Sequence, residues 1–328
     1  MKFKMSLLLL FIFYGAIYSW PKKMIITVPV ADLRNERSDV TDFSHTKYDT
    51  AQLTQLIFGE NVIAYEEVDG YLKVSAVDQE VYDFGKSEFI ECPGWIRSEQ
   101  ALEVEDFFNH NLIVKEPSAI IWDDEKSEEI IKIYLGTELS GAIGDGGFFD
   151  VIFPAGKGRI KNNQVLYLDD FNLDEESLRL EICNVAKLFL SNPYTWGGRS
   201  IHDELLESKG QLTGVDCSNL VSLSYKVCGM KIPRNSFSQH KKSRSINSGK
   251  ELKPADLVFT AQWKLSALGY KVGHVMIYLG DDCFIESIGG KIRKVMLTTG
   301  KDRFGKSVVE LNNDDKTNLG KVYFGTFF

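Results

Sequence analysis

The sequence predicts a multidomain protein in which two small all-β barrels precede an α+β domain. Its 328 residues are enough for two or three domains, since a domain averages about 150 residues. Residues 26 to 104 contain short β-type segments between turn residues, without helical periodicity. From residue 172 onward, helix-length segments come first and strand-like segments follow. The expected boundaries are 24–110 and 111–170 for the two barrels and 171–328 for the α+β domain.

The composition excludes long disorder and argues against nucleic acid as a partner. Hydrophobic residues make up 44% of the chain and aromatic residues 12%, which is enough to build buried cores. The 46 acidic residues outnumber the 38 Lys and Arg residues, and the net charge is −8. A protein that holds phosphate backbones needs the opposite sign. We therefore expect no nucleic-acid partner.

Residues 1–20 have the pattern of a secretory signal peptide. Lys2 and Lys4 form a basic head, residues 7–17 are apolar, and the small residue Ser19 suits a cleavage point. An uncleaved membrane anchor is the alternative, although the apolar run ends at Pro21, short of the roughly 20 residues that span a bilayer. We expect an extracytoplasmic mature chain, periplasmic or secreted, with no stable membrane insertion.

The five cysteines do not have the spacing of a metal site. Their number is odd, their spacing is irregular, and there is no Cys-x-x-Cys pair or Cys/His cluster among Cys92, Cys183, Cys217, Cys228 and Cys283. No structural metal is expected. In an oxidising compartment four of them could pair, but small buried thiols suit an apolar core equally well. We favour free thiols.

In the first barrel, four short β-type segments each lie between turn residues: 26–30, 61–67, 71–76 and 94–96. A weaker copy of this pattern follows between residues 111 and 168, where Leu135-Gly136-Thr137 repeats the turn at Gly59-Glu60. Many short strands at this spacing favour barrels, because closure removes exposed sheet edges. The pair Gly156-Lys157 lacks the neighbouring residues of a phosphate-binding loop, so a turn is expected there.

The α+β domain begins with a helix. Asn172, with Glu175 three residues later, predicts its cap, and Asn192-Pro193 predicts its end. A second helix is expected from about Cys217 to Val227, with Gly229 as its stop. Strands are then expected at 256–260, 274–279, 283–287 and 291–296.

Cys217 and His274 are candidates for a nucleophile and its base. Cys217 falls in the first turn of the second helix, where the helix dipole favours an anion such as a thiolate. The alternative is a buried cysteine that happens to start a helix. His274 begins an alternating strand, whereas the other four histidines lie in the barrels, a charged insertion or a basic run. A helix-borne cysteine beside a strand-borne histidine is the arrangement of papain-like sites.

Five ordered motifs carry a family resemblance: 194–198 (YTWGG), 216–221 (DCSNLV), 232–236 (IPRNS) with Gln239, 254–259 (PADLVF) and 273–280 (GHVMIYLG). They resemble the signature of the NlpC-type, papain-like cell-wall cysteine peptidases. The block 54–60 (TQLIFGE), with Gly70-Tyr71 and Gly94-Trp95, resembles a bacterial SH3-like domain. Two such barrels before the peptidase domain are similar to the subgroup that cleaves γ-D-glutamyl to L-diamino acid bonds of peptidoglycan stem peptides, with preference for a free N-terminal L-Ala.

The resemblance implies roles for eight residues. Cys217 is the nucleophile, His274 the general base and acid, and Glu286 occupies the position of a third polar residue that orients the imidazole. The substrate-binding residues it implies are Tyr194, Asp216, Ser218, Arg234 and Ser236. No cofactor is implied, the partners are peptidoglycan peptides, and we expect a monomer. For Glu286 the alternative is a surface strand residue.

Two departures concern the substrate pocket. Asn235 replaces an Asp found in many relatives, and Cys92 lies near the place of a Tyr. The first barrel is expected to contribute a wall to the pocket, for which the candidates are Glu66, Glu67 and Tyr82.

Two other functions stay open: a papain-like amidase or acyltransferase with another substrate, and a catalytically silent wall-binding protein. Intact Cys217 and His274 argue against the silent protein.

Overall fold

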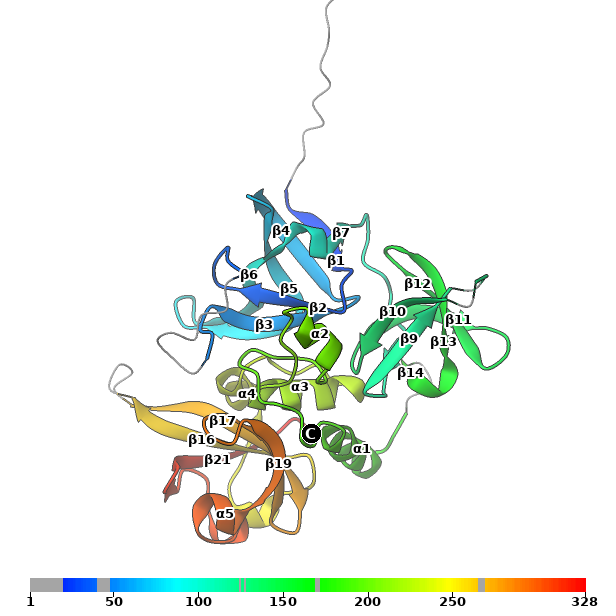
Figure 1. Cartoon of the computed structure of the whole chain (residues 1–328). Coiled ribbons are helices and arrows are strands. Elements are labelled where there is room, and N and C mark those ends of the chain that lie inside the picture. Colours follow the sequence, from blue (N-terminus) through cyan, green and yellow to red (C-terminus); the bar gives the residue numbers. More distant parts are fainter. Residues whose placement is uncertain (1–19, 40–47, 124, 127, 169–171, 265–268) are drawn as a thin grey trace, which may run out of the picture.

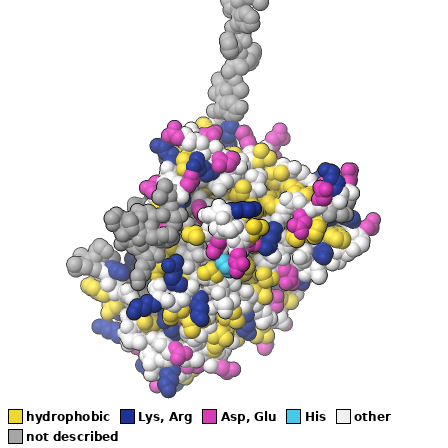
Figure 2. Space-filling model, in the orientation of Figure 1, with side chains coloured by type: hydrophobic (Ala, Val, Ile, Leu, Met, Phe, Trp, Pro, Cys, Tyr) yellow, Lys and Arg dark blue, Asp and Glu magenta, His cyan; other side chains and the backbone are white. Residues whose placement is uncertain are grey.

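A computed structural model of the chain describes residues 20–39, 48–123, 125–126, 128–168, 172–264 and 269–328. Figure 1 shows two β-rich units, with the third, helix-containing unit below them. The predicted signal peptide lies outside the described residues, apart from Trp20. In the described part of the chain, no helix is long and apolar enough to cross a membrane. On the face drawn in Figure 2, charged side chains of both signs lie among hydrophobic ones.

The first β-rich unit is a single antiparallel sheet with the strand order β3-β2-β6-β5-β4-β1-β7. Its strands are β1 (Lys22–Ile26), β2 (Val30–Arg34), β3 (Gln52–Ile57), β4 (Asn61–Val68), β5 (Tyr71–Asp83), β6 (Glu88–Arg97) and β7 (Ala101–Glu103). The hairpin of β5 and β6 is long enough to extend beyond β4, since β4 pairs only with residues 71–76 of β5. This extension carries residues of the first unit to the cleft described below.

The second β-rich unit is also one antiparallel sheet, with the order β10-β9-β13-β12-β11-β8-β14. Its strands are β8 (Leu112–Val114), β9 (Ser118–Trp122), β10 (Glu129–Tyr134), β11 (Glu138–Ile143), β12 (Phe148–Phe153), β13 (Gly156–Lys161) and β14 (Val165–Tyr167). Leu135-Gly136-Thr137 forms the turn between β10 and β11, as predicted, and Gly136 adopts φ +83°.

The expectation of closed barrels is wrong. Among the described residues, the strands at the two ends of each order, β3 with β7 and β10 with β14, do not pair. Closure would require these edges to meet, but β7 and β14 are only three residues long. The edge strand β3 instead contacts the third unit, where the Gln55 amide donates to the Leu212 carbonyl at 2.7 Å. The SH3-like identity of the two units stays a prediction.

The third unit mixes helices with an antiparallel sheet, in the order that the sequence predicts. Its helices are α1 (Glu175–Lys187), α2 (Glu204–Ser208), α3 (Cys217–Val227), α4 (Ser236–Lys242) and α5 (Gly300–Phe304). Its strands are β15 (Arg244–Ile246), β16 (Leu257–Lys264), β17 (Gly269–Gly280), β18 (Cys283–Ile288), β19 (Lys294–Thr299), β20 (Lys316–Thr317) and β21 (Gly320–Thr326). The cap of α1 is Asp174 and not Asn172, because its carboxylate accepts from the Ser177 N–H at 2.7 Å.

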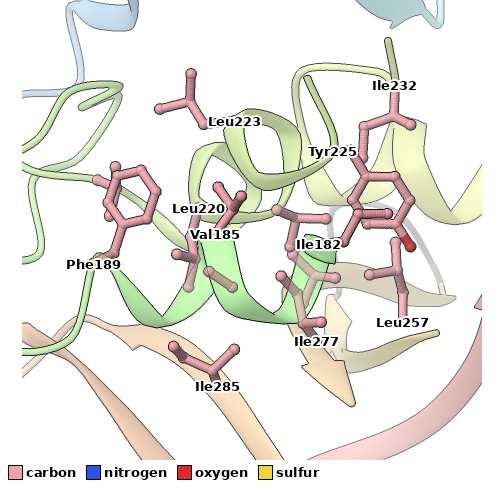
Figure 3. Close-up of a cluster of buried hydrophobic side chains, with 14 of the residues drawn as sticks. Ile182, Val185, Phe189, Leu220, Leu223, Tyr225, Ile232, Leu257, Ile277 and Ile285 are labelled. Atoms are coloured by element: carbon pink, nitrogen blue, oxygen red, sulfur yellow. The ribbon is translucent and has the colours of Figure 1, made fainter. Parts of the chain in front are cut away.

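Helix α3 lies at the centre of the molecule and all 11 of its residues are buried. Figure 3 shows the core around it, in which Leu220 and Tyr225 pack with Ile182 of α1 and Ile277 of β17. The same core includes one residue of β3, one of β8 and one of the β10–β11 turn, namely Ile57, Ile113 and Leu135. All three units therefore pack against the helix that begins at Cys217.

Candidate active site

Cys217 is the first residue of α3, and a tight turn places it there. Gly214 adopts φ +118°, and a side chain at this position would meet the Pro193 carbonyl oxygen at 2.4 Å. Only glycine suits this turn. Asp216 then caps the helix, because its carboxylate accepts from the Asn219 N–H at 2.8 Å. The N–H groups of the first turn, including that of Cys217, have no acceptor within the helix. Together with the helix dipole, they favour an anion at this position.

His274 and Glu286 meet across two neighbouring strands. The register that pairs Ile277 of β17 with Ile285 of β18 brings Glu286 diagonally beside His274 on the same face of the sheet. His274 Nε2 lies 2.6 Å from Glu286 Oε2. Glu286 is 0% exposed, so the alternative of a surface strand residue is wrong.

The His274 side chain is held between the Cys217 sulfur and the Glu286 carboxylate. Burial lowers the pKa of His274, but the charge and hydrogen bond of Cys217, together with those of Glu286, outweigh burial and raise the pKa to about 10. Burial raises the pKa of Glu286, and the hydrogen bond and charge of His274 overcome it, so this pKa is lowered. Since Nε2 binds Glu286, Nδ1 is the ring nitrogen left for Cys217. The arrangement favours an imidazolium beside the Cys217 sulfur.

Asp216, Ser218 and Arg234 form a closed set of polar contacts next to Cys217. Arg234 Nη2 lies 2.8 Å from Asp216 Oδ2, Arg234 Nη1 donates to Ser218 Oγ at 3.0 Å, and Ser218 Oγ donates to Asp216 Oδ1 at 3.0 Å. Arg234 Nη2 also donates to the Leu53 carbonyl of β3 at 2.8 Å. The helix cap of α3 is therefore connected to the first β-rich unit.

A cleft of about 410 Å³ opens at Cys217 between the first and third units. The third unit lines it with Trp196, Asn235, Gly273 and six predicted site residues: Tyr194, Asp216, Cys217, Ser218, Arg234 and Ser236. The first unit lines it with Thr50, Gln52, Leu53, Val81, Tyr82, Cys92 and Pro93. His274 follows the lining residue Gly273, and Glu286 lies behind His274.

The contribution of the first unit differs in part from the expectation. Tyr82 lines the cleft as expected, but Glu66 forms an ion pair with Lys73 at 3.1 Å, and Glu67 borders a separate depression near Trp20. Neither glutamate reaches the cleft. Gln52, Val81 and Pro93 are lining residues that sequence reasoning missed. They reach the cleft through the edge strand β3 and the extended β5–β6 hairpin, and no local sequence pattern indicates that contact.

Two cleft residues have roles that the structure makes specific: Asn235 caps a helix, and Tyr194 keeps its hydroxyl proton. The Asn235 amide oxygen caps α4 by accepting from the Ser238 N–H at 2.8 Å, a task that Asp performs equally well. Burial, with the nearby Cys217 and Asp216, raises the pKa of Tyr194, so its hydroxyl stays neutral. Its ring lies 5.6 Å from that of Tyr48. Tyr194 is thereby a fixed hydrogen-bond donor at the edge of the cleft.

The five cysteines are all free thiols. Cys92 lies in the cleft, and its burial raises its pKa to about 11. It is therefore a neutral thiol in the wall of the cleft, beside the predicted nucleophile. Within the described ranges, no group of three or more His, Cys, Asp or Glu side chains is arranged to hold a metal ion.

Helix, strand and cleft together have the form of a cysteine peptidase, and comparison with known proteins names the class. Residues 191–308 match the NlpC/P60 family. This match covers most of the third unit, which is therefore an NlpC/P60 domain.

Two relatives are similar over 71% of the chain, and both are named γ-D-glutamyl-L-lysine dipeptidyl-peptidase. The one from Bacillus cereus is 26% identical over 242 residues and the one from Bacillus subtilis 23% over 235. The matches span 66% and 71% of those relatives. The solved structure of an NlpC/P60 family protein from Bacillus cereus superimposes with a TM-score of 0.66 at 23% identity, covering 85% of this chain and 94% of that one. The shared fold thus includes much more than the peptidase domain.

Proposed function

We propose that this protein is a cysteine endopeptidase that hydrolyses the γ-D-glutamyl to L-diamino acid bond of peptidoglycan stem peptides, with a free L-Ala at the amino terminus. The observation that carries the proposal is His274, held between Cys217 and Glu286 at a cleft that the first β-rich unit helps to form. The names of the two Bacillus relatives support the choice of bond.

In the proposed mechanism, the Cys217 thiolate attacks the carbonyl carbon of the γ-glutamyl bond. The His274 imidazolium protonates the departing amine, and the acyl group stays on sulfur as a thioester. Water then attacks the thioester while His274 accepts its proton, which regenerates the thiolate and the imidazolium. Glu286 holds the ring orientation and stabilises its positive charge through both steps.

The oxyanion that forms on attack has two donors nearby. The backbone N–H of Cys217 lies in the first turn of α3, where a helix has no acceptor of its own for it, and the neutral Tyr194 hydroxyl lies in the same cleft. Removing one such donor typically costs about 3 kcal/mol of transition-state stabilisation.

The proposed amino-terminal subsite lies between Asp216 and the first unit. Asp216 is the carboxylate in the described cleft lining, and Ser218 and Arg234 fix its position. Leu53, Val81 and Tyr82 form a largely apolar wall across the cleft that limits the length of peptide beyond the scissile bond. We assign this role to a first unit of SH3-like type.

The remaining parts of the proposal concern the cellular location and the oligomeric state of the protein. We propose that residues 1–20 are a signal peptide and that the mature chain acts outside the cytoplasm as a monomer, where its substrate occurs. Relatives named as cell-wall hydrolases support this location.

The test is hydrolysis of L-Ala-γ-D-Glu-diaminopimelate by the mature protein, with mass detection of the released dipeptide. Acetylating the L-Ala amine should lower kcat/KM about a hundredfold or more, because a cation that pairs with Asp216 becomes a neutral amide. The Cys217→Ala variant is the control for contaminating peptidases. Equal rates on the two peptides would contradict the free-amine requirement. Absence of hydrolysis by a protein whose Cys217 is alkylated rapidly would favour an amidase or acyltransferase.

A further inference from the structure

The Glu286 carboxylate has more partners than the imidazole alone. Its Oε2 atom faces His274 Nε2 at 2.6 Å, while Oε1 accepts a hydrogen bond from the Thr298 hydroxyl of β19. Arg303 Nε of α5 lies 3.0 Å from the same Oε1 atom. The carboxylate is 0% exposed and the Arg303 side chain is 19% exposed. A single buried anion thus separates two cationic groups, one that can lose its charge and one that cannot.

The chain holds Arg303 firmly at this place. Helix α5 follows β19 directly, and a capping box fixes its start, in which Thr299 N–H donates to Asp302 Oδ2 at 2.9 Å and Asp302 N–H donates back to Thr299 Oγ1 at 3.2 Å. The next residue, Phe304, packs into a core with Phe284, two residues before Glu286. Arg303 is therefore anchored on both sides.

The contact of Arg303 with Glu286 is one of charge. Although Nε is close to Oε1, it makes no hydrogen bond to any described residue. The side-chain orientation needed for an N–H···O bond is missing, whereas Coulomb attraction at 3.0 Å does not depend on it. A different cation at the same place should therefore stabilise the Glu286 carboxylate equally well.

We propose that Arg303 is a positioning residue that keeps the Glu286 carboxylate charged and fixed while His274 gives up and regains its proton. The proposal rests on the function above in that it takes His274 as the group that protonates the leaving amine. Within the part of the chain that the structure describes, Arg303 forms no hydrogen bond or ion pair with His274 or Cys217, and it acts through Glu286.

The need for such a residue follows from the reaction. When the imidazolium delivers its proton, a buried carboxylate with no other cation would be left unpaired, which is unfavourable. Glu286 would then hold the imidazole proton too strongly. Arg303 leaves the carboxylate paired in both states of His274, so the proton is easier to transfer to the amine. The charged and titratable groups that act on the pair come from four elements: Cys217 of α3, His274 of β17, Glu286 of β18 and Arg303 of α5.

The test compares Arg303→Met and Arg303→Gln with Arg303→Lys, and uses Lys301→Met as the matched control. Lys301 is an exposed cation on the same short helix, whereas the ion pairs of Glu286 among the described residues are with His274 and Arg303. The first readout is the pKa of His274 by NMR of ¹⁵N-histidine-labelled protein, assigned with His274→Ala. This readout requires no substrate, so it is independent of whether the proposed hydrolysis occurs.

Loss of the positive charge should raise the pKa of His274 by about one unit in Arg303→Met and Arg303→Gln. Arg303→Lys and Lys301→Met should stay close to the wild type. In the Glu286→Gln background, Arg303→Met should have no further effect, since the connecting charge is gone. With the tripeptide, kcat should fall about tenfold in Arg303→Met with little change in KM.

Three results would overturn the proposal. The first is an unchanged His274 pKa in both neutral variants. The second is a shift in Lys301→Met as large as that in Arg303→Met, which would show a general effect of surface charge. Should Arg303→Met fail to fold, Arg303→Gln and Arg303→Lys still provide the comparison, and a Lys variant that behaves like Gln would equally refute a role through charge.

Discussion

Replacing Lys226 by methionine should loosen the contact between all three units. Lys226 lies near the end of α3 with its side chain 5% exposed. Its Nζ atom is 3.0 Å from Glu60 Oε1 of the first unit and 3.1 Å from Glu138 Oε2 of the second. Arg199 also binds Glu60, at 2.6 Å. One buried cation thus joins two carboxylates from separate β-rich units to the helix that carries Cys217.

The magnitude follows from what the substitution leaves behind. Glu60 keeps Arg199, but among the described residues the ion pair that Glu138 keeps is with Lys231 at 3.9 Å, so the two carboxylates lose the cation between them. Breaking a buried ion pair from one side typically costs about 3–5 kcal/mol. The matched control is Lys231→Met, because Lys231 is 54% exposed and binds Asp78 at 2.7 Å. Such exposed pairs contribute about 0–1 kcal/mol.

The free energy of unfolding of both variants is measured by urea unfolding followed by circular dichroism, and the measurement is repeated at several pH values. Burial raises the pKa of Glu60, but Arg199 and Lys226 outweigh it and lower the pKa to about 2. The pairing energy of Glu60 is therefore complete above its ordinary pKa of 4.5 and is lost as the pH falls toward 2. The difference between wild type and Lys226→Met should shrink over that range. Equal destabilisation by Lys226→Met and Lys231→Met at pH 7 would refute this account of the interface.

Three further predictions concern the site. Cys217→Ala and His274→Ala should each lower tripeptide turnover by several orders of magnitude with the fold intact by circular dichroism, because the two act as a unit; turnover near wild type in Cys217→Ala would end the peptidase hypothesis. Glu286→Gln should lower kcat about tenfold to a hundredfold and Glu286→His should restore it, and an unchanged rate in Glu286→Gln would make this residue a bystander. Since the pKa of His274 is raised to about 10, its contribution to stability should be complete below pH 6.5 and decline as the pH rises through 10. The alkaline limb of kcat/KM should lie near the same value, and a limb near pH 7 would contradict the ion pair.

Local pattern was enough to predict the elements that carry the proposed reacting groups. A helix beginning at Cys217 follows from the apolar spacing after it and from Gly229 as its stop, and strands at His274 and Glu286 follow from alternation. The predicted cap of α1, Asn172, lies two residues before the observed cap, Asp174. Both residue types are acceptable caps, and the sequence does not reveal which of the two side chains accepts from the Ser177 N–H.

Contacts between distant parts of the chain could not be predicted in the same way. The polar and acidic residues on β4 suggested Glu66 and Glu67 as the pocket wall, yet the register of β4 against β5 turns Glu66 toward Lys73. In the sequence, Lys226 looks like an ordinary basic residue in the last turn of a helix. Arg303 likewise looks like one basic residue among several near the end of the chain. Their partners lie 166 and 17 residues away, in strands whose positions are set by packing of whole units.

The first β-rich unit contributes to the geometry of the proposed catalytic site as well as to the shape of the cleft. The Leu53 carbonyl of β3 accepts from Arg234, whose guanidinium binds Asp216, the cap of the helix that begins at Cys217. The Arg234 backbone N–H in turn donates to the Glu80 carbonyl at 2.8 Å. Two strands of the first unit therefore hold the one arginine that fixes the helix cap. An amino-terminal unit that served only to recruit the protein to a surface would not need bonds to the cap of the helix that begins at the proposed nucleophile.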